Sequence, residues 1–155
     1  MKPIFVLNGP NLNLIGEREP EIYGAETLGE IEESLRKQAG AANFEIDFRQ
    51  TNYEGELVSW IQEARHAASA LILNAASYTH TSIAVLDALR TLSLPVAEVH
   101  LSNIFKREEF RHRSYVSPAA TGVICGFGPR SYRLALSVLI ELLNPPAPSN
   151  RGTHG

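Results

Sequence analysis

Cysteine is nearly absent from this sequence, because Cys125 is the only one among 155 residues. A single thiol forms no internal disulfide, and it cannot supply the several thiolates that bind zinc in structural sites. Disulfide scaffolds and thiolate zinc clusters are therefore excluded. Cys125 belongs to the apolar run 123–125, which predicts a buried position in the core.

Long apolar runs are also missing, and none approaches the roughly 20 residues that a helix needs to cross a bilayer. The apolar stretch within residues 1–7 is too short for a signal peptide, and polar residues follow it directly. We therefore expect a cytoplasmic protein without a membrane partner.

Positive charge is not in excess, since 14 basic and 17 acidic residues give a formal net charge of −3. The sequence thus has no basic footprint for nucleic acid. Basic residues gather only at Lys106, Arg107, Arg111 and Arg113, where two glutamates interrupt them. Such a short cluster suits either a solvated helix face or the binding of a small anion.

Lysine is scarce as well, and the only three stand at positions 2, 37 and 106. A Schiff base needs a lysine inside the site. Lys2 precedes the first expected strand and Lys37 falls within an expected helix, so only Lys106 is near the expected site. Imine chemistry is therefore disfavoured.

Several motifs of cofactor and catalytic sites are lacking. The segment 126–131 fits neither G-x-G-x-x-G nor G-x-x-x-x-G-K-[ST], so nucleotide binding has little support. His80, His100 and Glu98 remain conceivable metal ligands, but no H-E-x-x-H spacing supports them. A serine triad built on Ser77 or Ser82 lacks the G-x-S-x-G elbow.

A regular alternation of strand and helix patterns runs through the chain. Short apolar or alternating runs predict strands at 4–7, 44–48, 70–73, 95–99 and 122–125. Apolar residues spaced three or four apart predict helices at 27–39, 57–68, 82–92, 102–111 and 129–143. Thr27 and Glu30 have the spacing of a capping box, Ser102 can cap the fourth helix, and Pro129 suits the first turn of the last.

Five strands that alternate with helices indicate a parallel sheet covered on both faces. The favoured arrangement is a flavodoxin-like three-layer α/β fold with strand order 2-1-3-4-5. We expect residues 1–144 to form a single catalytic domain and the proline-rich segment 145–155 to be a disordered tail. Ligands of such folds bind beyond the carboxyl ends of the strands, near the switch in strand order.

Polar residues fall at these carboxyl ends. The first strand runs into a long loop, residues 8–24, whose length is typical of a functional lid and which contains Asn11, Arg18 and Tyr23. Each of these residues also has an ordinary role, as a turn former, a solvated charge or a packing residue.

Two histidines stand at adjacent strand ends, which favours function over a structural role. His80 follows the third strand and His100 the fourth. Alternation along a strand sends Glu98 and His100 to the same face, which suits a carboxylate that orients an imidazole.

Acid–base chemistry is what these residue types favour. A tyrosine near its reference pKa of about 10 is a poor base, but a nearby guanidinium favours the phenolate, and Arg18 lies close to Tyr23 along the loop. His100 can deliver a proton to a leaving oxygen. Asn74 or an ordered water can hold a developing enolate oxygen.

An anion site is expected beside this chemistry. The helix predicted to begin near Ser102 offers free backbone N–H groups for a carboxylate, and Arg111 could pair with the same group.

Five segments in this order resemble the type II 3-dehydroquinate dehydratases, which are enzymes of the shikimate pathway. They are LNGPNLNL (7–14), REPEIYG (18–24), YTHTS (78–82), EVHLSN (98–103) and REEFRH (107–112). The resemblance covers nearly the whole chain, from residue 4 to about residue 143. It implies a lyase that converts 3-dehydroquinate to 3-dehydroshikimate by anti elimination through an enolate, without cofactor, metal or Schiff base.

The resemblance also assigns roles. Tyr23 as phenolate removes the proton next to the ketone, Arg18 stabilises that charge, and a water near Asn11 holds the enolate. His100, oriented by Glu98, protonates the departing hydroxyl. The residues that bind substrate hydroxyls and carboxylate are Asn74, His80, Leu101, Ser102 and Arg111.

An assembly is implied as well. In the family, Asp87 reaches the site of a neighbouring subunit, and twelve subunits assemble as four trimers. The alternative from another class is a flavodoxin-like module that binds a nucleotide or a flavin, which the missing phosphate loop disfavours.

Overall fold

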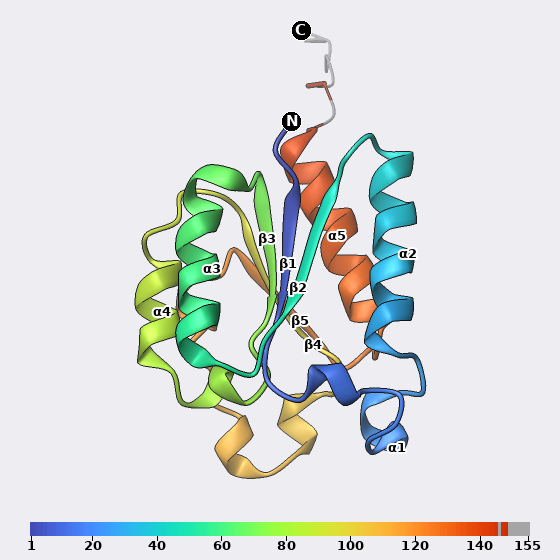
Figure 1. The fold of residues 1–155 in the computed structure, drawn as a ribbon, viewed down its shortest axis with the longest axis vertical. Helices are drawn as coiled ribbons and strands as arrows, with labels where there is room; N and C mark the ends of the chain where they lie inside the picture. The colour runs from blue at the N-terminus through green and yellow to red at the C-terminus, as the bar shows by residue number, and fades with distance from the viewer. Residues whose placement is uncertain (146, 149–155) are drawn as a thin grey trace, which may run out of the picture.

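The computed structural model describes residues 1–145, 147 and 148. Most of the segment 145–155, for which a disordered tail was expected, lies outside the described residues. Within them, a single five-stranded parallel sheet has the order β2-β1-β3-β4-β5, which confirms the predicted order (Figure 1). The strands are β1 (Ile4–Asn8), β2 (Ile46–Gln50), β3 (Ala70–Asn74), β4 (Val96–His100) and β5 (Gly122–Cys125).

The continuous apolar runs of the sequence form the central strands. Every residue of β1, β3 and β4 is buried, as continuous apolar segments require when helices cover both faces of a parallel sheet. The strand β5 lies at an edge, and its first two residues are exposed. Cys125 is consequently only half-buried, so its predicted position in the buried core was wrong.

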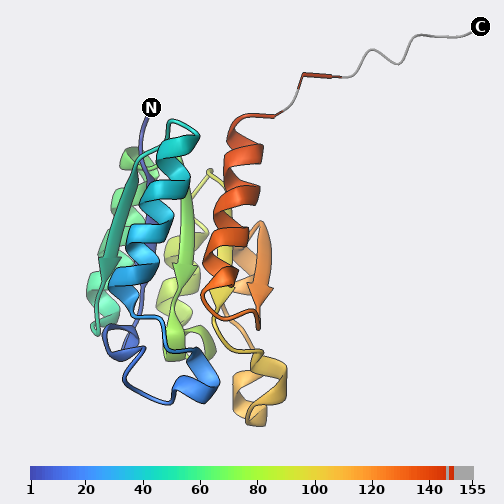
Figure 2. The same cartoon turned by 90° about the vertical axis from the view of Figure 1, so that its right-hand side faces the viewer.

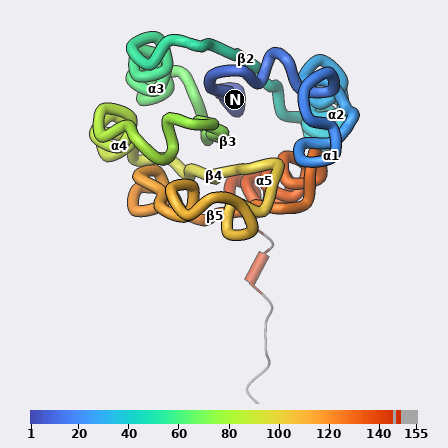
Figure 3. Tube along the Cα trace, turned by 90° about the horizontal axis from the view of Figure 1, so that it is seen from below, coloured from blue at the N-terminus to red at the C-terminus, as the bar shows by residue number. Residues whose placement is uncertain are grey.

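The long helices form the outer layers, as Figures 2 and 3 show. The helices α2 (Leu28–Ala41) and α5 (Arg130–Leu143) pack on one face, and α3 (Glu54–Ala67) and α4 (Ile83–Leu89) on the other. The predicted capping box begins α2, because Thr27 Oγ1 accepts a hydrogen bond from the Glu30 N–H at 3.2 Å. Helix α4 ends three residues before the predicted Leu92, since the chain there closes into a turn with hydrogen bonds to the third preceding residue.

The helix predicted from Ser102 to Arg111 was wrong. The chain forms two separate 3₁₀ turns instead, η3 (Ile104–Lys106) and η4 (Glu109–Arg111). Asn103, not Ser102, caps η3 by accepting a hydrogen bond from the Phe105 N–H at 3.1 Å. The backbone of Arg107 is extended, at φ −101° and ψ −168°, and this breaks the helical path. The segment after β4 therefore does not form the long helix whose N-terminus was expected to face the site.

The loops at the carboxyl ends of the strands gather at the lower edge of Figure 1. The loop after β1 contains η1 (Leu12–Leu14) and a short helix, α1 (Pro20–Tyr23), whose first position is the proline that often begins helices. The loop after β3 contains η2 (Ala76–His80). Gly9 lets these two loops meet, since a Cβ at that position would lie 2.4 Å from the Ala75 carbonyl oxygen.

Candidate active site

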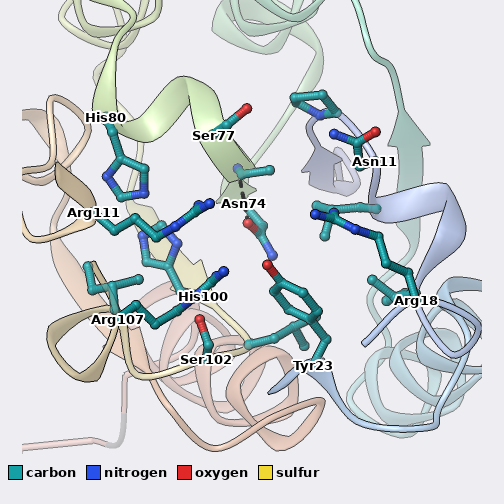
Figure 4. A pocket seen from close by; sticks show the side chains of 16 residues that line it. Asn11, Arg18, Tyr23, Asn74, Ser77, His80, His100, Ser102, Arg107 and Arg111 are labelled. Atoms are coloured by element: carbon teal, nitrogen blue, oxygen red, sulfur yellow. Dashed lines mark hydrogen bonds between the residues drawn. The ribbon is translucent and has the colours of Figure 1, made fainter. Parts of the chain in front are cut away.

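A cleft opens where β1, β3 and β4 end, at the position that the fold predicts for a ligand site. The space between its walls is about 730 Å³, which includes volume that is open to solvent. The lining residues with polar side chains are Asn11, Arg18, Tyr23, Asn74, Ser77, His80, His100, Ser102, Arg107 and Arg111 (Figure 4).

The imidazole of His100 is hydrogen-bonded to a buried carboxylate. Its Nε2 lies 2.6 Å from Glu98 Oε2, and both side chains are almost fully buried. Ser117 and Ser114 donate hydrogen bonds to Glu98 at 2.6 and 3.0 Å. Burial raises the pKa of Glu98, but the hydrogen bonds from His100, Ser117 and Ser114 outweigh it, so the pKa lies below its ordinary value. A charged carboxylate only accepts, so Nε2 carries a hydrogen and Nδ1 is left to meet a ligand.

His80 stacks beside His100, with ring centroids 6.3 Å apart. Its Nδ1 lies 2.8 Å from the Arg113 carbonyl oxygen, which only accepts, so Nδ1 is the donor and Nε2 carries the lone pair. Burial lowers the pKa of His80, and the nearby charges of His100 and Arg111 lower it further. At neutral pH this imidazole is neutral, and it can hydrogen-bond a ligand hydroxyl.

Two arginines approach the ring of Tyr23. The guanidinium carbon of Arg107 lies 5.1 Å from the ring centroid, and that of Arg18 lies 5.8 Å away. Figure 4 shows the Tyr23 hydroxyl directed into the middle of the cleft, with the imidazoles on the other side. Both guanidinium groups lie within the cation–π range of about 6 Å from the ring centre.

The loop after β1 is held by side chains at the end of β2 and in the segment directly after it. Asn11 has a left-handed backbone, at φ +68°, and its N–H donates to Asn52 Oδ1 at 3.0 Å. Gln50 Nε2 donates to the same oxygen and to the Gly9 carbonyl. These contacts give Asn11 a defined place beside the cleft.

Comparison with known proteins identifies the family of this chain. A family model described as Dehydroquinase class II matches residues 2–140. The chain belongs to the class II dehydroquinase family. It is 52% identical over 154 residues to a 3-dehydroquinate dehydratase of Brucella abortus strain S19, covering 99% of this chain and 98% of the relative. It is 56% identical over 140 residues to 3-dehydroquinate dehydratase 2 of Pseudomonas aeruginosa, covering 90% and 95%.

Solved structures of type II dehydroquinases have the same fold. The crystal structure from Propionibacterium acnes matches with a TM-score of 0.87 at 44% identity, covering 90% of this chain and 97% of that one. The structure from Butyrivibrio crossotus matches with a TM-score of 0.86 at 39% identity, covering 89% and 97%.

The sequence-predicted site residues of this class II dehydroquinase chain fall into three groups. Glu98 lies beneath the cleft, where it contacts His100, and Asp87 is exposed on α4, outside the cleft. The others line the cleft, namely Asn11, Arg18, Tyr23, Asn74, His80, His100, Leu101, Ser102 and Arg111.

Arg107 lines the cleft without having been predicted there. The basic cluster in the sequence was the signal that could have found it. The extended backbone at Arg107 and a bond of 3.0 Å between its carbonyl oxygen and His112 Nε2 set its position.

Replacing Glu98 by glutamine tests the buried carboxylate. Because the folded pKa of Glu98 lies below its ordinary value of 4.5, its charge adds stability above about pH 4.5. This contribution disappears as the pH falls through the lowered folded value. In urea unfolding near neutral pH, the free energy of unfolding of Glu98→Gln should be about 1–3 kcal/mol lower than that of the wild type. In acid, this difference should be smaller. The exposed Glu33→Gln should show no such difference, and a difference that widens in acid would contradict the prediction.

Proposed function

We propose that this chain dehydrates 3-dehydroquinate to 3-dehydroshikimate, a lyase reaction, through an enolate and with anti stereochemistry. The observation that carries the proposal is one cleft with Tyr23 between two guanidinium groups and His100 on a buried carboxylate. The relatives that are named 3-dehydroquinate dehydratase support the same substrate.

The first step removes a carbon-bound proton next to the ketone. Tyr23 acts as a phenolate and takes that proton, while the charges of Arg18 and Arg107 stabilise the phenolate before the transfer. The electron pair of the broken bond moves to the ketone oxygen, which becomes an enolate. A water held near Asn11 donates to that oxygen.

The second step expels the hydroxyl group. The enolate re-forms the ketone and pushes out the hydroxyl, which takes a proton from Nδ1 of protonated His100 and leaves as water. Glu98 stabilises the positive imidazolium before the transfer. The proton left on Tyr23 then returns to solvent and His100 is protonated again, so the cycle balances.

Substrate binding uses the remaining polar groups. Arg111 pairs with the substrate carboxylate through its terminal guanidinium nitrogens. Its Nε donates instead to Glu108 Oε2, at 2.8 Å. Within the described residues, the N–H groups of Leu101 and Ser102 donate no hydrogen bond, so they are available to the same carboxylate. Asn74 and His80 bind hydroxyl groups.

A direct assay separates this function from the alternative, a module that binds a nucleotide or a flavin. The product of the proposed reaction is an enone, which absorbs in the ultraviolet. We expect purified protein to be colourless and to generate this absorbance from 3-dehydroquinate. A yellow protein without turnover would support the flavin module instead.

The reaction is proposed to use neither metal nor Schiff base. Among residues 1–145, 147 and 148, no three His, Cys, Asp or Glu side chains are grouped to hold a metal ion, and no lysine lines the cleft. Turnover should survive exhaustive chelation, and borohydride added with substrate should leave the protein unmodified by mass spectrometry. Loss of turnover under chelation would indicate a metal, and a covalent adduct would indicate an imine.

The assembly is also a proposal. We propose a cytoplasmic homododecamer of four trimers, built from residues 1–144 as one catalytic domain, in which Asp87 reaches a neighbouring site. Exposed apolar side chains support contacts between subunits, since such patches mark interaction surfaces. Those on and near β5 and α5 are Val123, Phe127, Leu134, Val138 and Leu142. Within the described residues, no helix has the length and apolar character to span a membrane.

A further inference from the structure

Tyr132 is a fully buried tyrosine whose hydroxyl reaches from α5 to the ends of two central strands. It donates to Asn8 Oδ1 on β1 at 2.7 Å and accepts from Asn74 Nδ2 on β3 at 2.9 Å. Burial raises the pKa of this phenol, so it stays protonated at neutral pH and keeps its donor. Tyr132 does not line the cleft, but Asn74 does.

The direction of each hydrogen bond follows from the two ends of this chain of contacts. The Arg49 carbonyl can only accept, so Asn8 presents Nδ2 to it, at 2.9 Å, and turns Oδ1 toward Tyr132. The Tyr132 hydroxyl must then donate to Asn8 and accept from Asn74. At the other end, the Ala76 N–H can only donate, so Asn74 Oδ1 faces it at 3.2 Å. Both ends require the same orientation of the Asn74 amide.

This orientation decides what Asn74 offers to a ligand. One hydrogen of Nδ2 is engaged by Tyr132, and Oδ1 is engaged by Ala76. The group left for the cleft is the second N–H of Nδ2, which is a donor. Figure 4 shows the Asn74 side chain extending from the end of β3 toward the middle of the cleft. A flipped amide would instead present its oxygen to the cleft and would repel a ligand oxygen.

We propose that Tyr132 is a positioning residue, which acts through Asn74 by keeping the N–H of its amide directed at a substrate oxygen. The inference rests on the proposed function, because it names the part of that site which recognises a hydroxyl or carbonyl group. The buried hydrogen bonds of the Tyr132 hydroxyl thus decide whether Asn74 presents a donor or an acceptor to the cleft.

Double-mutant kinetics test whether Tyr132 acts through Asn74. Tyr132→Phe removes only the hydroxyl and should lower kcat/KM for 3-dehydroquinate about tenfold, mainly through KM. The same change in an Asn74→Ala background should alter kcat/KM less than twofold, because the group that it positions is gone. A structural role alone would lower both backgrounds equally.

A matched control lies next to Tyr132 on the same helix. Ser131 is fully buried, its Oγ accepts a hydrogen bond from the Phe127 N–H at 3.1 Å, and it does not line the cleft. Ser131→Ala therefore removes one buried hydrogen bond without touching Asn74, and it should leave kcat/KM unchanged. Thermal melts of all variants report any loss of folding.

A second variant covers the case in which Tyr132→Phe does not fold. Asn8→Ala takes away the acceptor of the Tyr132 hydroxyl, which can then turn its hydrogen toward Asn74 and favour the flipped amide. It should also lower kcat/KM, again only while Asn74 is present. Calorimetric binding of quinate, a cyclic hydroxy acid that is not the substrate, gives a readout that does not depend on turnover.

The outcomes are distinct. A wild type that binds quinate but does not dehydrate 3-dehydroquinate rejects the proposed function, while a tenfold weaker Kd for quinate in Tyr132→Phe still supports the positioning role. Unchanged kcat/KM and Kd in folded Tyr132→Phe overturn the inference. Equal losses with and without Asn74 overturn it as well.

Discussion

Tyr23→Phe is expected to lower kcat by about 10³-fold while the protein stays folded, since a positioned acid or base contributes roughly 10²–10⁴-fold. The substitution removes only the oxygen that takes the proton. The ring keeps its contacts with the two guanidinium groups, at 5.1 and 5.8 Å from its centroid. Binding of quinate should therefore change little.

Tyr53→Phe is the matched control, because Tyr53 is 74% exposed and does not line the cleft. Its kcat should equal that of the wild type. Turnover by Tyr23→Phe within a few-fold of the wild type would reject Tyr23 as the base.

His100→Ala is expected to lower kcat by about 10²–10³-fold, because the leaving hydroxyl loses its proton donor. The buried Glu98 carboxylate, which lies 2.6 Å from Nε2 in the intact protein, also loses its main partner. The free energy of unfolding should therefore fall by about 1–3 kcal/mol, together with the loss of turnover. His66→Ala, at an exposed position of α3, should change neither quantity.

Isotope exchange separates the two steps. In heavy water, His100→Ala should still exchange the acidic hydrogen of 3-dehydroquinate for deuterium, because Tyr23 and the enolate site are intact. Tyr23→Phe should show no enzyme-dependent exchange. Mass spectrometry of recovered substrate measures both. If His100→Ala loses exchange as well, His100 acts in the first step and the assignment of roles is wrong.

The fold was determined by local patterns in the sequence. Continuous apolar runs at 4–7 and 70–73 predict strands covered on both faces, and the structure buries every residue of β1 and β3. Alternation along a strand places Glu98 and His100 on one face, and the two side chains meet at 2.6 Å. The topology then brings the loops after β1, β3 and β4 to one edge, where Tyr23, His80 and His100 line one cleft.

Other features depend on contacts between residues that are far apart in the chain, which no local pattern records. Arg107 reaches the ring of Tyr23 because its backbone is extended, whereas its sequence context predicts a helix. Ser117 stabilises Glu98 from 19 residues away, and Tyr132 contacts Asn8 from 124 residues away. Local periodicity reports which face of an element is apolar. The partners of a buried polar group are decided only when distant elements pack and each donor must find an acceptor.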